Sequence, residues 1–141
     1  MVVAGFLIAS AMAAVSRMSV AALSSSSNLS DRARIEAAIN DNIQAMQKED
    51  SYYTDQWIID NVGQSALDNA CSNPSAALRD HLQTIAPEVR IATIQRTFDI
   101  SSIPGILRIA YTFEGPEQQV KTEQRVIEMT PNFAAKCYST R

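Results

Sequence analysis

An unbroken apolar opening constrains this chain more than any other stretch of its sequence. Residues 1–15 carry no charge and a single hydroxyl group, that of Ser10. Residues 16–47 follow without a proline or a glycine, so that no residue there forces a helix to end. We therefore predict one long N-terminal helix. About 46 residues of helix span roughly 70 Å, which is more than a small domain can cover, so part of the helix must project.

Three interpretations of the apolar opening compete. A cleaved secretory signal needs basic residues before its apolar core, but the first basic residue is Arg17. A transmembrane helix needs about 20 apolar residues. The apolar run here is 15 residues long and reaches Leu23 only across Ser16, Arg17 and Ser19. We favour the third interpretation, a truncated apolar helix whose true start lies upstream of Met1, because the run begins at the first residue.

The helix becomes amphipathic in its second part. Four consecutive serines from Ser24 weaken it, because serine side chains compete for backbone hydrogen bonds. We favour a continuous helix, with residues 24–30 as its weak point; the alternative is a bend or loosening there and a second helix that begins near Asp31. From there large apolar residues recur at helical spacing and predict a face that packs on a domain: Ile35, Ile39, Ile43 and Met46.

Residues 48–87 are expected to connect this helix to a sheet through short helices. Residues 55–62 suit one short helix, which Gly63 ends. Asn73 and Pro74 are a helix-start signal, and that helix should run to Ile85, before Pro87. His81 lies on its apolar face without a nucleophile beside it, so we interpret it as structural.

Two groups of side chains in this connection have the residue types of a binding site. The aromatic residues Tyr52, Tyr53 and Trp57 would suit a sugar- or partner-binding patch, but we favour a small hydrophobic cluster that holds the connection on the domain. The oxygen-bearing side chains of Asp60, Asp68 and Asn69 match no calcium-loop spacing, so we discount a calcium site.

After Pro87 the apolar residues recur with a period of two. Residues 88–100, 106–114 and 119–129 read as strands separated by turns at 101–105 and 115–117. Short turns join consecutive strands into an antiparallel meander with one buried face. We therefore predict an α+β fold, in which the second half of the helix packs on a three- to four-stranded antiparallel sheet. The sheet side of the core is predicted to be Leu107, Ile109, Tyr111 and Phe113.

Composition excludes several functions. The chain of 141 residues has a formal net charge of -3 and no run of basic residues, so we expect no specific nucleic-acid binding. Two cysteines and one histidine are too few for a zinc site of the Cys/His type. The sequence offers no nucleophile with a partner, phosphate loop or metal cluster, so we predict neither a cofactor nor an enzyme. Cys71 and Cys137 most simply form a disulfide that ties down residues 130–141, the alternative being two buried thiols.

This order of elements resembles the type IV pilins and the related pseudopilins: an apolar helix, its amphipathic continuation, a variable connection, an antiparallel meander and a disulfide-tied tail. The nearest motif is the rhythm of Gly5-Phe6-Leu7-Ile8-Ala9 within the opening. The family's signature of a basic leader, a glycine, an aromatic first residue and a nearby glutamate is not present in this sequence.

The resemblance implies a structural subunit of a type IV pilus or a type II secretion pseudopilus. Residues 1–23 would lie in the bacterial inner membrane before assembly, as a single-pass anchor with the domain outside the cytoplasm, and in the filament core afterwards. Residues 24–141 would form the globular domain: 24–47 the amphipathic helix half, 48–87 the connection, 88–129 the meander and 130–141 the tail.

Implied partners are other pilin-like subunits, the inner membrane and the assembly machinery. The alternative is a monomeric membrane-anchored or secreted binding domain of the cell envelope. Helix-bundle packing is predicted for Val2, Val3, Gly5, Phe6, Leu7, Ala9, Met12 and Ala13.

Overall fold

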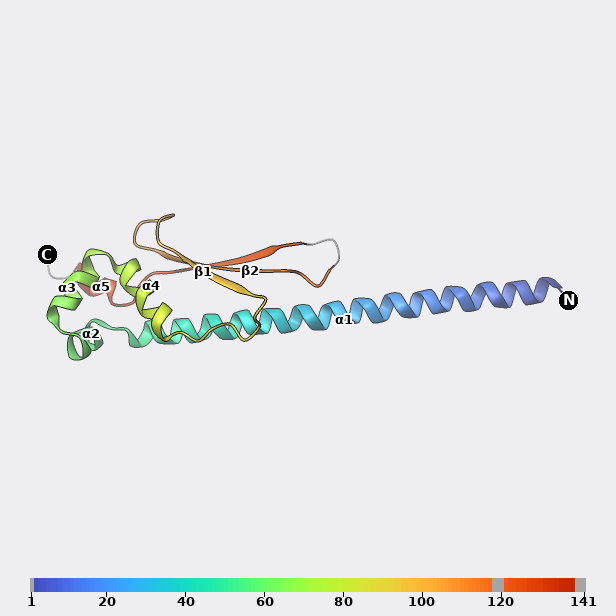
Figure 1. Ribbon diagram of the computed structural model, residues 1–141, viewed down its shortest axis with the longest axis horizontal. Helices are drawn as coiled ribbons and strands as arrows, with labels where there is room; N and C mark the ends of the chain where they lie inside the picture. The colour runs from blue at the N-terminus through green and yellow to red at the C-terminus, as the bar shows by residue number, and fades with distance from the viewer. Residues whose placement is uncertain (1, 118–120, 139–141) are drawn as a thin grey trace.

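A single long helix organises the molecule. The computed structural model describes the backbone of residues 2–117 and 121–138, and the side chains of residues 25–117 and 121–138. Helix α1 spans Val2–Tyr52, and its N-terminal half extends well beyond the rest of the chain (Figure 1). The continuous helix is confirmed, since α1 runs through residues 24–30, and the alternative of a second helix beginning near Asp31 is wrong. Serine costs an interior helix position only about 0.5 kcal/mol relative to alanine, and no proline interrupts the backbone hydrogen bonds.

Short helices and an antiparallel sheet follow α1. The sheet has three strands in the order β1-β2-β3, and both pairings are antiparallel. This arrangement confirms the α+β class, with three strands in the described chain. The elements after α1 are α2 (Asp55–Asn61), α3 (Gln64–Ser72), α4 (Pro74–Ile85), β1 (Gln95–Asp99), β2 (Leu107–Phe113), β3 (Glu123–Met129) and α5 (Ala134–Cys137).

Local sequence accounts for several of these boundaries. The Thr54 side chain accepts a hydrogen bond from the backbone N–H of Trp57 and caps α2. Gly63 then takes a φ of 113°, which favours glycine, and turns the chain into α3. The Asn73 side chain caps α4 by accepting from the N–H of Ala76, with Pro74 at the first turn. Helix α4 therefore begins and ends where the Asn-Pro and Ala-Pro pairs place it.

Two strands are shorter than their apolar patterns suggest. Strand β1 begins at Gln95 instead of residue 88, because residues 86–94 run as an irregular segment with hydrophobic residues packed against the core. Strand β3 begins at Glu123 instead of residue 119, and residues 118–120 lie outside the described part of the chain. Strand β2 alternates strictly between buried and half-buried side chains over Leu107–Phe113.

The main core lies between α1 and one face of the sheet. Ile39, Ile43 and Met46 of α1 are buried there, and Ile35 is half-buried at the edge. Helix α4 covers the same core with Leu78 and Leu82. The sheet contributes Leu107, Ile109, Tyr111, Phe113 and Met129, with Phe98 and Ile127 partly buried on either side of Ile109. Ile94, directly before β1, is buried in the same core.

A second, smaller core lies at the end of the domain away from the N-terminus. Ile58 of α2, Ala70 of α3 and Phe133 are buried together. A disulfide joins Cys71 at the end of α3 to Cys137 at the end of α5. Helix α5 had no signal in the sequence, because one turn is too short for a helical period to show. The segment with Phe133 and α5 thus packs on the α2–α3 pair (Figure 1).

Candidate functional site

Helix α1 changes its environment near residue 32. From Ile39 to Met46 its apolar side chains are buried against the sheet. From Ser25 to Asp31 its side chains are exposed or half-buried, and Leu29 is 67% exposed. Figure 1 shows no other element of the described chain beside the N-terminal part of α1.

Arg32 fixes the point at which α1 leaves the sheet. Its Nε and one terminal nitrogen donate to the carboxylate of Glu117 at 2.9 and 2.7 Å. Its terminal nitrogens also donate to the two carboxylate oxygens of Glu123, at 3.1 and 2.6 Å. The hydrogen bond from Arg32 lowers the pKa of Glu117, and the two carboxylates raise the pKa of Arg32. One turn further along, Arg125 of β3 donates to Glu36. These contacts set the direction of the helix relative to the sheet.

A buried polar network joins α1, the start of the sheet and the segment after α4. Asn42, which is 4% exposed, donates from Nδ2 to the carbonyl of Pro87 at 2.8 Å. Its Oδ1 accepts from Arg96 at 2.8 Å and from the Tyr111 hydroxyl at 2.9 Å. Arg96 also donates to the Pro87 carbonyl at 2.9 Å. Burial raises the pKa of Tyr111 to about 12 and lowers that of Arg96.

Sequence reasoning missed both polar systems. Asn42 carried a signal, since it interrupts the apolar face between Ile39 and Met46 and a buried amide needs partners. The Arg32 contacts carried none, because their carboxylates lie 85 and 91 residues away in the chain.

Aromatic rings fill the corner where α1 ends. Tyr53 stacks on His81 with ring centroids 3.9 Å apart, and Trp57 lies edge-on to His81 at 5.3 Å. Tyr53 also meets Phe133 edge-on at 5.3 Å. Burial lowers the pKa of His81, so the imidazole is neutral at pH 7. Tyr52 is exposed and lies outside this cluster, with the Lys48 ammonium 5.9 Å from its ring centre. Tyr53 and Trp57 therefore hold the connection on the domain.

Open grooves lie on the described part of the domain. The tip groove, of about 620 Å³, runs between α2, α3 and α5 beside the disulfide, and its polar lining is Asp55, Gln64, Asp68, Ser72, Lys136 and Tyr138. The helix groove, of about 530 Å³, runs between α1 and the segment after α4, and it is lined by Arg34, Ala37, Ala38, Asp41, Arg90 and Ile91.

The described side chains offer little for metal chemistry. No group of three or more His, Cys, Asp or Glu residues within them is placed to hold a metal ion. Asp60 and Asp68, two of the discounted calcium ligands, accept hydrogen bonds from Gln56 at 2.8 Å and from Gln64 at 3.2 Å.

The predicted helix-bundle residues, from Val2 to Ala13, lie among the residues whose side chains are not described. Within the described part of the chain, no helix is long and apolar enough to cross a membrane. The described half of α1 carries Asp31, Arg32, Arg34 and Glu36 within six residues, which is incompatible with a hydrocarbon environment. The predicted location as a single-pass inner-membrane protein is contradicted by this finding.

Comparisons of the chain with protein-family models, with curated proteins and with solved structures find no match. The resemblance to type IV pilins therefore stays a prediction, and a proposal of function has to rest on the geometry of the chain.

Proposed function

We propose that this chain is a structural subunit of a filament of the type IV pilus or type II secretion pseudopilus kind, and that it polymerises through the N-terminal part of α1. The observation that carries the proposal is the division of α1. One half packs on a small domain, and the other half extends from it (Figure 1).

The extending half of α1 has an apolar sequence that other apolar groups need to cover. Residues 1–15 are apolar on every side of the helix, and the next charge, Arg17, is the only one before Asp31. A helix that is hydrophobic all round is stable when other apolar helices surround it. Nothing in the described chain covers this half, so other copies of the same helix are the partners that we propose.

The contacts at the helix exit suit this role. A subunit that transmits force between its helix and its domain needs a fixed angle between them. Arg32 holds two carboxylates from the sheet side, and Glu36 holds Arg125 one turn later. Bidentate arginine–carboxylate contacts of this kind add directionality as well as attraction.

Filament formation by the full chain in its own host tests the proposal. A tagged chain should be found along sheared surface filaments by immunogold electron microscopy. Leu7→Arg should reduce filament yield more than roughly a hundredfold, because a buried unpaired charge costs several kcal/mol. The matched control is Ile103→Arg, which places the same charge on the exposed β1–β2 turn and should assemble normally.

Filaments that form equally well with Leu7→Arg would contradict assembly through this helix. A wild-type chain that is never found in filaments and stays monomeric would instead favour the alternative, a monomeric binding domain.

A further inference from the structure

The two grooves carry opposite sets of charges. The helix groove is lined by two cationic side chains, Arg34 and Arg90, and by the carboxylate of Asp41. The tip groove has two carboxylates, Asp55 and Asp68, with the ammonium of Lys136. The helix groove therefore carries two positive charges and one negative charge, and the tip groove carries two negative charges and one positive charge.

The arginines of the helix groove are not used within the described structure. Arg32, Arg79, Arg96 and Arg125 each donate to a carboxylate, amide or carbonyl oxygen. Arg34 and Arg90 are exposed and have no hydrogen-bond or ion-pair partner among the described side chains. Asp41, on the same wall as Arg34, also has none.

The tip groove lies in the most acidic part of the chain. Residues 49–78 contain five acidic side chains and no lysine or arginine, so the remainder of the chain is net positive although the whole carries -3. Tyr138 adds an aromatic ring, 78% exposed, at the edge of this groove. Carboxylates beside an exposed ring suit guanidinium groups, which pair with carboxylates and stack on aromatic faces.

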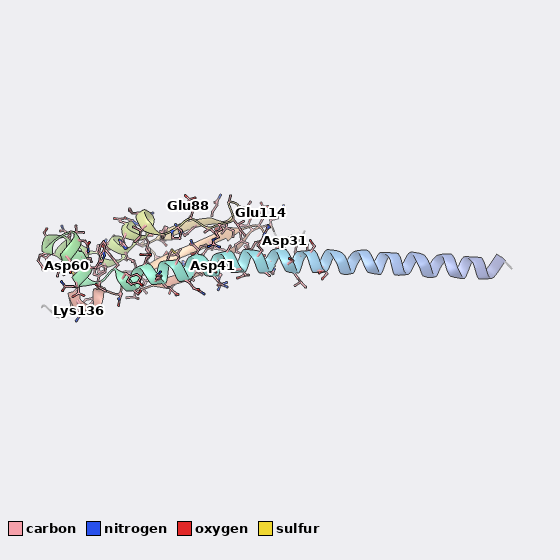
Figure 2. All side chains as sticks on the ribbon, turned by 90° about the horizontal axis from the view of Figure 1, so that it is seen from below. Asp31, Asp41, Asp60, Glu88, Glu114 and Lys136 are labelled. Atoms are coloured by element: carbon pink, nitrogen blue, oxygen red, sulfur yellow. A yellow bond between two sulfur atoms is a disulfide. The ribbon has the colours of Figure 1, made fainter. Side chains whose placement is uncertain are left out.

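The grooves lie at separate ends of the domain. Figure 2 labels Lys136 and Asp60 at the tip of the domain, and Asp41 on α1 nearer the extending half. Along α1 alone, Arg34 and the helix end at Tyr52 are about 27 Å apart. One copy therefore cannot fill its own helix groove with its own tip.

We propose that the tip groove of one copy docks on the helix groove of the next, with Asp55 and Asp68 facing Arg34 and Arg90. This docking rests on the proposed filament function and names a contact between domains in addition to the helix bundle. The two surfaces differ, so the contact is heterologous, and a heterologous contact that does not close into a ring generates an open filament.

Reversing the charges of each groove in the full chain tests the docking. Arg34→Glu with Arg90→Glu makes both grooves acidic, and Asp55→Lys with Asp68→Lys makes both basic. Each double variant expressed alone should yield at least roughly tenfold fewer filaments, since like charges then face each other. Expressed together, the two variants should assemble as an alternating copolymer, because each acidic groove meets a basic one.

Matched controls make the same change in net charge as the groove variants but spare the grooves. Lys48→Glu with Lys121→Glu, and Glu114→Lys with Glu128→Lys, should assemble like the wild type. Filaments from either groove variant alone at wild-type yield would overturn the docking, and so would a mixture that fails although both chains accumulate.

Failure of the proposed function is distinguishable from failure of the docking. If the wild type forms no filaments, the function is overturned, and sedimentation velocity of the detergent-solubilised full chain then decides the docking. The docking is supported if the two double variants associate only when they are mixed. It is overturned if each variant associates equally well on its own, or if the variants do not associate at all.

Discussion

Asn42 shows at the scale of single residues how one buried polar group can order three segments. Its amide binds the Pro87 carbonyl, the Arg96 guanidinium and the Tyr111 hydroxyl at 2.8–2.9 Å. Arg96 reaches the same carbonyl, so the segment after α4 is held from two sides. Buried polar groups stabilise a fold when all of them are paired, and they destabilise it strongly when one partner is lost.

This difference predicts unequal effects of two substitutions in the network. Asn42→Ala leaves the Tyr111 hydroxyl without an acceptor and deprives Arg96 of one of its own, so it should lower the free energy of unfolding by about 2–3 kcal/mol. Tyr111→Phe leaves Asn42 Oδ1 paired with Arg96 and should cost only about 1 kcal/mol. Urea unfolding followed by circular dichroism measures both. A larger loss for Tyr111→Phe than for Asn42→Ala would show that the network is not the stabilising element.

Tyr111 also predicts a pH dependence. Burial raises the pKa of Tyr111 to about 12 from 10.0, against the opposing effect of Arg96 and Arg125. Between these pH values the unfolded chain releases the phenol proton while the folded chain retains it. The free energy of unfolding should therefore fall as pH rises from 10 toward 12, and be unaffected by this group below pH 10.

Tyr111→Phe provides the comparison, because its stability should fall less steeply over the same range. Ultraviolet absorbance should also show one tyrosine that ionises near pH 12 in the folded wild type and is missing from the variant. A wild type and a variant with parallel stability profiles would contradict the assignment.

At the scale of elements, α1 has a packed half and an extending half, which differ in the burial of their apolar side chains. Ile39 is fully buried, whereas Leu29, ten residues earlier on the same helix, is 67% exposed. Both are large aliphatic residues, so composition does not distinguish them. The position of the sheet relative to the helix does.

Alanine substitutions at these two positions should locate the boundary of the domain. Ile39→Ala removes buried methyl and methylene groups and should lower the free energy of unfolding by about 3 kcal/mol. Leu29→Ala should change it by no more than about 0.5 kcal/mol. Chemical unfolding of the full chain in detergent measures both. Comparable losses would mean that the packed half of α1 begins earlier than Arg32.

The elements differ in how far their sequence predicts them. Helix α4 was predictable because Asn73 and Pro74 fix its start and Pro87 limits its end. Strand β2 was predictable because one of its faces is buried and the other is half-exposed. The serine run does not interrupt α1, because intrinsic preference at a few positions is weaker than a continuous backbone hydrogen-bond ladder. Strand β1 was overextended because residues 88–94 are apolar for packing on the core and not for pairing in the sheet.

At the scale of the whole molecule, the chain is a small domain carried on one end of a long helix (Figure 1). Two cores stabilise the domain, one under the sheet and one beside the disulfide. Neither includes a described residue before Ile35, so domain folding should not depend on the extending helix.

Removal of residues 1–23 tests this independence. The shortened chain should be soluble, folded and monomeric, because both cores and the Arg32 contacts remain. Sedimentation velocity should give a single monomeric species, and circular dichroism should show retained strand and helix signals. Aggregation or unfolding of the shortened chain would show that the extending half contributes to the domain itself.

The sequence by itself determined the long helix, its apolar and amphipathic parts, the α+β class and the meander, because each depends on patterns within a few residues of the chain. Only the tertiary structure decided where the helix leaves the sheet, how Asn42 is paired and where the two grooves lie. Those features join residues that are 45 or more positions apart, such as Arg32 with Glu123 and Asn42 with Pro87. Local periodicity carries no information about such partners, because they are brought together only when the helix and the sheet pack.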